Sequence, residues 1–381
     1  MSTFILRLPS PPTGPAVTRI AVKDLIDMAG LPTTCGSQAI ADRASPATAD
    51  APCLAGIRAA ERSGTAAIVG KVNMHELAFG VSGINPWFGT PTNPLDPDLV
   101  PGGSSSGSAV AVASGDADVA LGSDTGGSVR IPAACCGVVG LKTTKGRVSL
   151  EGVSLLAGSL DTVGPMGATV AATGLGMSLL EPGFDWVSAA PAARIGRFRP
   201  PADGWVDAAI DDALDRYREA GHGRIVEVDL PGWDAATAAF TAILGAEAWA
   251  TNKDLWAASA DQLSPDVAVR LEGCSSITAE QVAEAWATAR RWTAEMDRVL
   301  ASVDVVALPV LASAPTPIAD ASRMGSLRLT GPFNVSGGPA LALPVPSPSG
   351  PVPASLQLAG PSGSEDRLLA TGSLMEQVVA R

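Results

Sequence analysis

Short apolar runs recur along the chain and alternate with longer segments of helical periodicity. Apolar runs bounded by Gly, Pro, Asn or Asp clusters predict buried β-strands. Such runs lie at residues 19–22, 66–69, 138–141, 225–228, 303–310, 340–345 and 354–358. Strands that alternate with helices predict an α/β fold, here a mixed central sheet wrapped by helices in a single domain.

Two segments have the period of an amphipathic helix. The first covers residues 203–219, and Gly221 is its expected stop signal. The second covers residues 278–300 and is rich in Ala, Arg and Glu, with Thr278 as its expected N-cap.

The composition excludes several classes of protein. The chain has 381 residues, of which 46% are hydrophobic, so it can form a large core. Its net charge of −12 argues against nucleic-acid binding. The chain has neither an apolar run of about 18 residues nor the apolar core of a signal peptide, so neither a membrane span nor secretion is expected.

The cysteines indicate a reducing compartment. Their number is odd and they lack the spacing of metal ligands. Buried, reduced thiols in a cytoplasmic protein without a bound metal are the simplest interpretation. The five cysteines are Cys35, Cys53, Cys135, Cys136 and Cys274.

The segment from residue 101 to residue 144 carries the strongest chemical signal. Two Gly/Ser clusters, at residues 102–108 and 126–128, are joined by a run of Ala, Val and Gly. Glycines leave backbone N–H groups uncovered and adopt conformations barred to other residues. A buried strand or helix is not expected to contain so many glycines and hydroxyls, whereas a site that holds an oxyanion beside a serine nucleophile is.

A serine nucleophile needs a base, and the two histidines are poor candidates. His222 lies in an expected surface turn, His75 lies in an expected helix with a structural role, and no G-x-S-x-G motif occurs. A lysine can act as a base only when burial or neighbouring positive charge keeps it neutral. Lys23 follows a buried strand and could project from its end into a cleft, the alternative being an exposed lysine paired with Asp24.

Two other motifs, those of a phosphate-binding loop and of an aspartic protease, are only partly matched. Lys71 follows a glycine as in a phosphate-binding loop, but its spacing from Gly64 is one residue too long and Val72 replaces the required Ser or Thr. The triplet at residues 124–126 also occurs in aspartic proteases, which need a second copy or a short chain that dimerises. This long chain contains no second copy.

The motifs as a set resemble those of the amidase signature family of serine hydrolases. The resemblance implies a single domain with a large mixed sheet. Its signature core would cover about residues 19–170 and 303–381, and a helical region at about 186–302 would vary with substrate. Besides residues 101–144, the matching blocks are 19–37, 68–80, 88–94, 333–345 and 354–369.

The resemblance implies a Ser–cis-Ser–Lys catalytic triad. Ser128 would be the nucleophile and Lys23 the base. Ser104, 24 residues before Ser128, would follow a cis peptide bond and bridge the two. Lys71 would have a supporting role, and Ser105 would supply a further hydroxyl.

The same resemblance places the oxyanion hole in the glycine-rich loop. Its donors would be backbone N–H groups, while Asp124 and Arg130 beside the loop would be structural. The donors would belong to Thr125, Gly126, Gly127 and Ser128.

The expected reaction is hydrolysis of a small carboxamide to a carboxylate and ammonia or an amine. No cofactor is implied, and the enzyme would be a monomer or homodimer. Aromatic walls favour a neutral, partly apolar acyl group, and no basic cluster marks the helical region, so an aryl-acetamide is expected. The first 170 residues resemble short amidases of the indole-3-acetamide hydrolase type. The expected pocket residues are Phe79, Gly80, Trp87, Phe88 and Phe333.

Two alternatives remain. The chain could be the glutaminase (A-type) subunit of a tRNA-dependent amidotransferase, which needs partner subunits. Only 22 residues precede Lys23, and Ser106 replaces the commoner glycine, both of which argue against this alternative. The chain could also be a binding module that has lost catalysis, although Lys23, Ser104 and Ser128 are all present.

Overall fold

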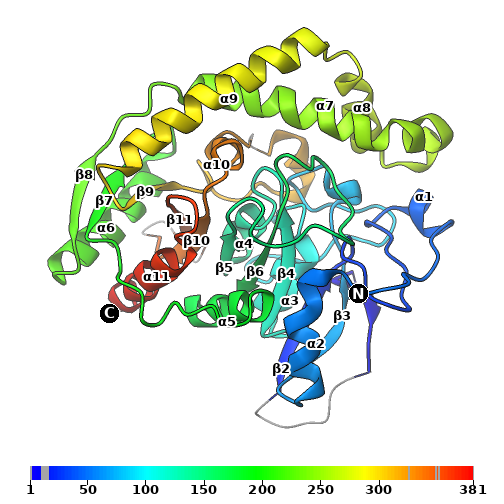
Figure 1. Ribbon diagram of the computed structural model, residues 1–381, viewed down its shortest axis with the longest axis horizontal. Coiled ribbons are helices and arrows are strands. Elements are labelled where there is room, and N and C mark those ends of the chain that lie inside the picture. The colour runs from blue at the N-terminus through cyan, green and yellow to red at the C-terminus, as the bar shows by residue number, and fades with distance from the viewer. Residues whose placement is uncertain (1, 10–16, 325–326, 348–349, 351, 381) are drawn as a thin grey trace.

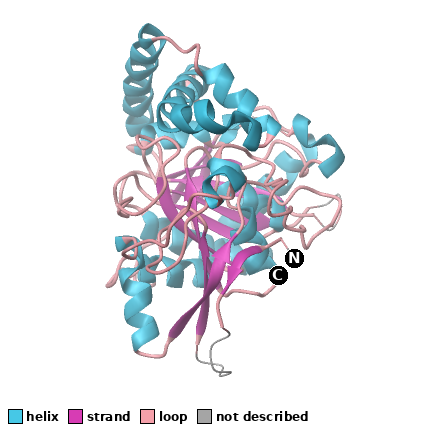
Figure 2. Ribbon diagram, turned by 90° about the vertical axis from the view of Figure 1, so that its right-hand side faces the viewer, coloured by secondary structure: helices cyan, strands magenta, loops and turns pink. Residues whose placement is uncertain are grey.

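A mixed sheet of eleven strands runs through the centre of the part of the chain that the structure describes (Figures 1 and 2). The structure is a computed structural model and describes residues 2–9, 17–324, 327–347, 350 and 352–380. The spatial order of the strands is β1-β3-β2-β4-β6-β5-β10-β11-β9-β7-β8. The strands are β1 (Phe4–Arg7), β2 (Thr18–Lys23), β3 (Ala66–Val72), β4 (Val119–Asp124), β5 (Val139–Lys142), β6 (Thr162–Gly167), β7 (Arg194–Arg197), β8 (Arg224–Glu227), β9 (Val305–Pro309), β10 (Ala340–Val345) and β11 (Ala354–Ala359).

Helices cover both faces of the sheet, and α7 packs along α9 as a separate helical layer at the top of Figure 1. The α-helices are α1 (Gln38–Ala41), α2 (Ala55–Arg62), α3 (Ser106–Ala113), α4 (Arg130–Cys136), α5 (Val170–Leu180), α6 (Gly204–Glu219), α7 (Trp233–Ser259), α8 (Pro265–Cys274), α9 (Ala279–Leu300), α10 (Gly331–Ser336) and α11 (Glu365–Val379).

Side chains of β10 show how one strand serves two cores. Leu341 and Leu343 belong to the cluster formed with α5, α6 and α11. Ala342, between them, belongs to the cluster formed with α3 and α4. Successive side chains of a strand point to opposite faces, so the sheet separates these two cores.

The structure corrects the expectation that a buried helix would not contain many glycines and hydroxyls. Helix α3 is made of Ser, Gly, Ala and Val and is buried along almost its whole length. Small side chains let it lie close to its neighbours: a Cβ on Gly107 would come within 2.5 Å of the Asn73 carbonyl oxygen. One on Gly122 of β4 would lie 2.8 Å from the Ser105 hydroxyl.

The periodic segments fold as predicted. All seven expected strands are confirmed, as are α6 and α9. Thr278 caps α9 through a capping box with Gln281, and Gly221 follows α6 with a positive φ of 79°. The expectation of a helix around His75 is wrong, because His75 is extended and precedes only a short 3-10 helix, Glu76–Ala78.

Four strands were not predicted: β1, β4, β6 and β7. Strand β4 reads Val-Ala-Leu-Gly-Ser-Asp and β6 reads Thr-Val-Gly-Pro-Met-Gly, so neither has the alternating or branched apolar pattern of a typical strand. All the residues of both strands are buried, and close packing leaves room only for small side chains at many of their positions.

Among the described helices, none is long and apolar enough to cross a membrane.

Candidate active site

Two neighbouring parallel strands end at the same edge of the sheet and bring the site together. Strands β2 and β4 are paired in parallel, with Ile20 opposite Val119 and Val22 opposite Leu121. Their carboxyl ends therefore lie side by side, which is where open α/β sheets commonly bind ligands. Lys23 is the last residue of β2, and the glycine-rich loop at residues 125–129 follows β4.

The side chain of Lys23 is fully buried and surrounded by hydroxyls. Its Nζ lies 2.7 Å from Ser104 Oγ, 2.8 Å from Ser105 Oγ and 2.8 Å from Ser123 Oγ. The Gly103–Ser104 peptide bond is cis. A neutral amine has two N–H donors and one lone pair, so three hydroxyl neighbours can satisfy it with one of them donating to nitrogen.

Burial lowers the pKa of Lys23 to about 7. Two carboxylates oppose this effect and favour the ammonium form: Asp124 and Asp161. Because desolvation prevails, a large fraction of the side chain is a neutral amine at neutral pH. A neutral, hydrogen-bonded amine is what a lysine general base requires.

A buried ion pair fixes the glycine-rich loop. Arg130 Nη2 lies 2.8 Å from Asp124 Oδ1, and its Nε lies 2.9 Å from Oδ2. Burial alone would raise the pKa of Asp124, but Arg130 brings it well below its usual range. The same arginine donates to Gln357 of β11 and Asn334 of α10, so distant parts of the chain hold the loop.

The four expected oxyanion donors are not equivalent. The Gly127 N–H donates to Asp124 Oδ1 at 2.7 Å and is therefore engaged. The N–H groups of Gly126 and Ser128 have no acceptor among the residues that the structure describes. Gly126 also has no room for a side chain, because a Cβ would lie 2.4 Å from the ring of Phe240.

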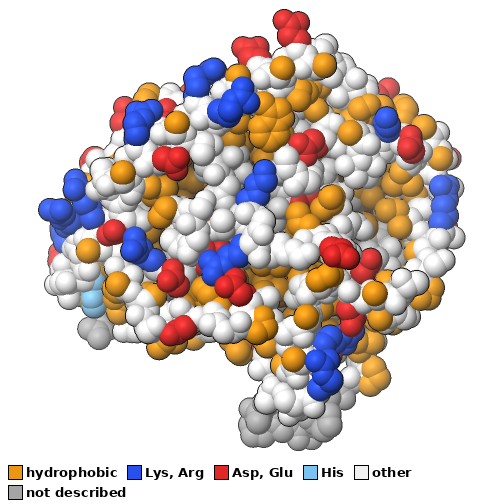
Figure 3. Space-filling model, in the orientation of Figure 1, with side chains coloured by type: hydrophobic (Ala, Val, Ile, Leu, Met, Phe, Trp, Pro, Cys, Tyr) orange, Lys and Arg blue, Asp and Glu red, His pale blue; other side chains and the backbone are white. Residues whose placement is uncertain are grey.

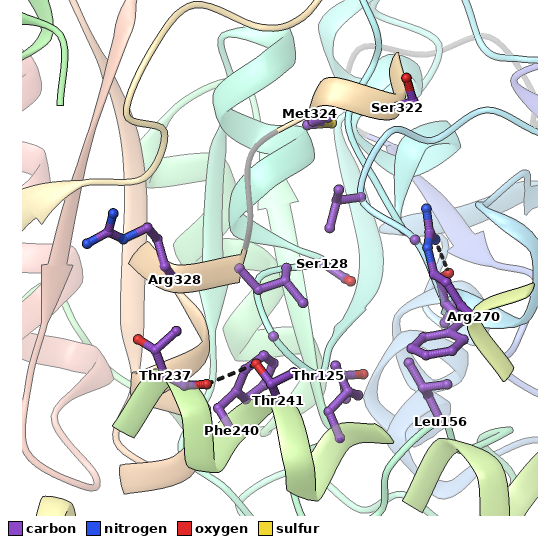
Figure 4. Close-up of a pocket in the computed structure, with 17 residues that line it drawn as sticks. Thr125, Ser128, Leu156, Thr237, Phe240, Thr241, Arg270, Ser322, Met324 and Arg328 are labelled. Carbon is purple, nitrogen blue, oxygen red and sulfur yellow. Dashed lines mark hydrogen bonds between the residues drawn. The ribbon is translucent and has the colours of Figure 1, made fainter. Parts of the chain in front are cut away.

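A pocket of about 390 Å³ lies over the glycine-rich loop, and Ser128 is part of its wall (Figure 4). Its described lining comes from the loop at residues 78–81, from α7, from α8 and from Ser322, Met324, Leu327 and Arg328. Apolar side chains such as Leu156, Phe240 and Leu244 make up much of the wall. The described lining residues are Ala78, Phe79, Gly80, Val81, Thr125, Gly126, Ser128, Leu156, Thr237, Phe240, Thr241, Leu244, Arg270, Ser322, Met324, Leu327 and Arg328.

Only some of the expected pocket residues lie there. Phe79 and Gly80 line the pocket, whereas Trp87, Phe88 and Phe333 are not among the described residues of its wall. Phe333 is buried, and its ring packs 5.5 Å from that of Trp233 in a separate core. The sequence alone therefore did not distinguish aromatic residues of the pocket from aromatic residues of the core.

Two arginines at the pocket were missed by sequence reasoning. Arg270 of α8 lines it, and so does Arg328 from the segment before α10. Arg270 donates to the Phe79 carbonyl oxygen at 2.6 Å and lies 3.3 Å from Asp266. The helical region thus contributes positive charge to the pocket although it contains no basic cluster in sequence. On the face shown in Figure 3, basic and acidic side chains are interspersed.

Lys71 and His75 occupy supporting positions. Lys71 forms a buried ion pair with Asp24 at 3.0 Å and donates to the Pro32 carbonyl oxygen at 2.8 Å. His75 is buried, and its Nε2 lies 3.1 Å from Asp266 Oδ2. Asp24 therefore pairs with Lys71 rather than with Lys23, and Lys23 stays free of a direct ion pair among the described residues.

Comparison with known proteins gives a consistent result. The family model described as Amidase matches residues 19–369. The A-type subunit of the glutamyl-tRNA(Gln) amidotransferase of Halobacterium salinarum is 34% identical, with 94% of this chain and 95% of that protein covered. The 2-amino-5-chloromuconic acid deaminase of Comamonas testosteroni is 32% identical, with 95% and 81% covered. A crystal structure of an amidase is similar with a TM-score of 0.84 at 31% identity, covering 95% of this chain and 84% of that one.

The fold and these relatives define the protein as an amidohydrolase, an enzyme that hydrolyses amide C–N bonds. The chain belongs to the amidase family, which confirms the resemblance drawn from its sequence. A buried lysine beside a serine that follows a cis peptide bond is consistent with the family's triad.

The lowered pKa of Lys23 predicts a stability that depends on pH. Unfolding returns the pKa of Lys23 from about 7 to its ordinary value near 10.5, so the unfolded chain binds more protons between these values. The free energy of unfolding should therefore rise with pH across that window. Lys23→Met should reduce the slope, measured by urea denaturation at several pH values between about 7 and 10. Lys142, whose burial also lowers its pKa to about 7, should maintain a residual slope. An unchanged slope in Lys23→Met would contradict the buried neutral amine.

Proposed function

We propose that the protein is a stand-alone amidase that cleaves a small carboxamide through an acyl-enzyme on Ser128. The observation that carries this proposal is the 2.7 Å contact between Lys23 Nζ and Ser104 Oγ, which lies behind a pocket lined by Ser128. A base with a pKa near 7 works close to neutral pH, where proton transfer in both directions is easy. The five free thiols suit a reducing compartment such as the cytoplasm.

In the first step, the Ser128 hydroxyl attacks the carbonyl carbon of the amide. Its proton passes to Ser104, and the proton of Ser104 passes to the lone pair of Lys23. The carbonyl oxygen becomes an oxyanion, which the free N–H groups of Gly126 and Ser128 are placed to stabilise. Thr125 belongs to the same glycine-rich loop.

In the second step, the proton returns from Lys23 through Ser104 to the amide nitrogen. The C–N bond breaks, ammonia or an amine leaves, and the acyl group remains as an ester on Ser128. Water then attacks this ester and gives a proton through Ser104 to Lys23. That proton returns through Ser104 to the Ser128 oxygen as the ester C–O bond breaks, and the acid product leaves and ionises to the carboxylate. Both half-reactions use one lysine because it is neutral before each attack and protonated after it.

The shape of the pocket supports a small acyl group with an apolar part. Phe79, Leu156 and Phe240 can pack against an aromatic or branched group, so we retain an aryl-acetamide as the first substrate to test. Thr237, Phe240 and Arg270 come from the helical region at residues 186–302, which supports its role as the part that selects the substrate.

A second candidate substrate follows from Arg270. Its guanidinium is partly exposed at the pocket and could pair with a carboxylate at the far end of the acyl group, as in glutamine or malonamate. The relationship to A-type amidotransferase subunits keeps glutaminase activity with partner subunits as the alternative function. A catalytically silent binding module is disfavoured because Lys23, Ser104 and Ser128 are all present.

The proposed triad predicts sharply different effects for two neighbouring buried lysines. Ser128→Ala should abolish turnover and labelling by a fluorophosphonate probe, while Lys23→Ala should reduce both about 10²–10⁴-fold. Lys71→Ala should mainly lower the free energy of unfolding, by about 3–5 kcal/mol, because it leaves Asp24 buried and unpaired. Probe labelling and urea denaturation of the three variants would measure both effects. A folded Lys71→Ala protein as unreactive as Lys23→Ala would show that the wrong lysine was chosen, and labelling that persists in Ser128→Ala would refute the nucleophile.

The substrate proposal predicts a preference that Arg270 can alter. The purified protein alone should hydrolyse phenylacetamide and indole-3-acetamide with a higher kcat/KM than glutamine or malonamate. If carboxylate amides are preferred instead, Arg270→Gln should lower their kcat/KM about tenfold or more, with little effect on neutral amides. Arg216→Gln, a change on the distant helix α6, serves as the control. Hydrolysis of glutamine that appears only with added amidotransferase subunits would favour the alternative function.

A further inference from the structure

A buried carboxylate behind the pocket wall has no part in the triad. Asp161 precedes β6, is only 4% exposed, and accepts three hydrogen bonds. The Thr125 hydroxyl donates at 2.5 Å, and the N–H groups of Leu156 and Ala157 donate at 2.9 and 3.1 Å. Thr125 and Leu156 both line the pocket, so the Asp161 side chain connects the nucleophile's loop to the segment that carries Leu156.

Asp161 also lies close to the lysine. Ser123, a hydrogen-bond partner of Lys23, lines one small gap in the interior together with Thr125 and Asp161. The ammonium form of Lys23 is favoured by Asp161, and the ionised form of Asp161 is favoured in return by Lys23. The interaction is therefore reciprocal, and both side chains are buried.

The other groups that face Lys23 are already neutral or paired. Asp124 of β4 forms its ion pair with Arg130. Cys35 is a neutral thiol, because burial raises its pKa to about 12. Among the described residues, Asp161 forms no ion pair with an arginine, lysine or histidine, so its charge is free to act on Lys23.

We propose that Asp161 is a positioning residue of the amidase, which holds Thr125 and Leu156 in place and stabilises the charged form of Lys23. The proposal rests on the proposed function, in which Lys23 takes a proton from Ser104 during attack. Lys23 changes from neutral to positive in that step, while its side chain is fully buried. A fixed negative charge nearby stabilises the product of the transfer more than the reactant, which lowers the barrier.

The protonation states of Asp161 and Lys23 are consistent with this role. Burial raises the pKa of Asp161 to about 6, and three hydrogen bonds to its carboxylate oppose the effect. Above that pH the side chain is ionised, while Lys23 loses its proton near pH 7. At slightly alkaline pH, Asp161 is therefore charged and Lys23 is neutral, which is the state ready for attack.

Asp161→Asn tests the proposal because the amide keeps the shape and loses the charge. The rate of Ser128 labelling by a fluorophosphonate probe would be measured from about pH 5 to 9, so no substrate is needed. In the native protein the rate should rise with pH through about 7, as Lys23 becomes neutral. Without the negative charge the ammonium is less stable, so the rise should move to lower pH by about one unit. The maximal rate should fall about tenfold, since the charge that develops on Lys23 is no longer stabilised.

Asp118→Asn is the matched control. Asp118 lies just before β4 and pairs with Arg19 of β2 at 2.6 Å, so it joins the same two strands at their opposite end. Its removal should leave the labelling profile unchanged. A purely structural role of Asp161 would lower the rate without moving the pH profile, and that result would overturn the proposal.

A second pair of variants covers the case in which Asp161→Asn does not fold. Thr125→Val removes the hydroxyl that donates to Asp161 and conserves shape, whereas Thr125→Ser retains the donor. Thr125→Val should show a lower maximal rate and a shifted profile, and Thr125→Ser, which keeps the donor, should keep the native midpoint of the pH profile whatever its maximal rate. Identical profiles for Val and Ser would refute the role of Asp161. Failure of the proposed function itself would look different, because the native protein would then not be labelled at Ser128 or Lys23→Ala would be labelled at the native rate.

Discussion

The burial of one lysine amine is the constraint on which the site depends. Lys23 has no ion-pair partner among the described residues and is surrounded by the hydroxyls of Ser104, Ser105 and Ser123. Desolvation brings its pKa to about 7, well below the ordinary value of a lysine in water. The sheet makes this possible, because β2 ends inside the protein between β3 and β4. The neighbouring Lys71 shows the contrast: Asp24 pairs with it, and it serves the structure.

Small residues are the means by which the site is assembled. Serines and glycines in α3 and at its start allow that helix to lie directly against β4 and bring two hydroxyls to Lys23. The glycine-rich loop then turns between β4 and α4 under the control of Asp124 and Arg130. Because Arg130 also binds Asn334 and Gln357, the last third of the chain is needed to shape a loop near residue 126. The family match from residue 19 to residue 369 agrees with this dependence.

The fold could be predicted where physical patterns are local. Strands such as β10 and β11, and the capped helix α9, have apolar periodicity that reports their burial directly. Strands β4 and β6 were missed because their composition is set by close packing with helices, which no local pattern records. The residues of the site were named from a motif, and the structure brings Lys23 to Ser104, while Asp161 and Ser123 carried no signal of their own.

The sequence by itself determined the α/β class, the family and the residues of the expected triad, since these depend on periodicity and on a long, specific motif. Only the tertiary structure decided what surrounds them. It places Arg270 and Phe240 at the pocket and Phe333 in a core. It also directs the Gly127 N–H to Asp124, to which it donates a hydrogen bond. The physical reason is that burial, charge pairing and free hydrogen-bond donors are properties of neighbours in space. Residues such as Asp161 and Thr125, 36 positions apart, meet only when the sheet forms.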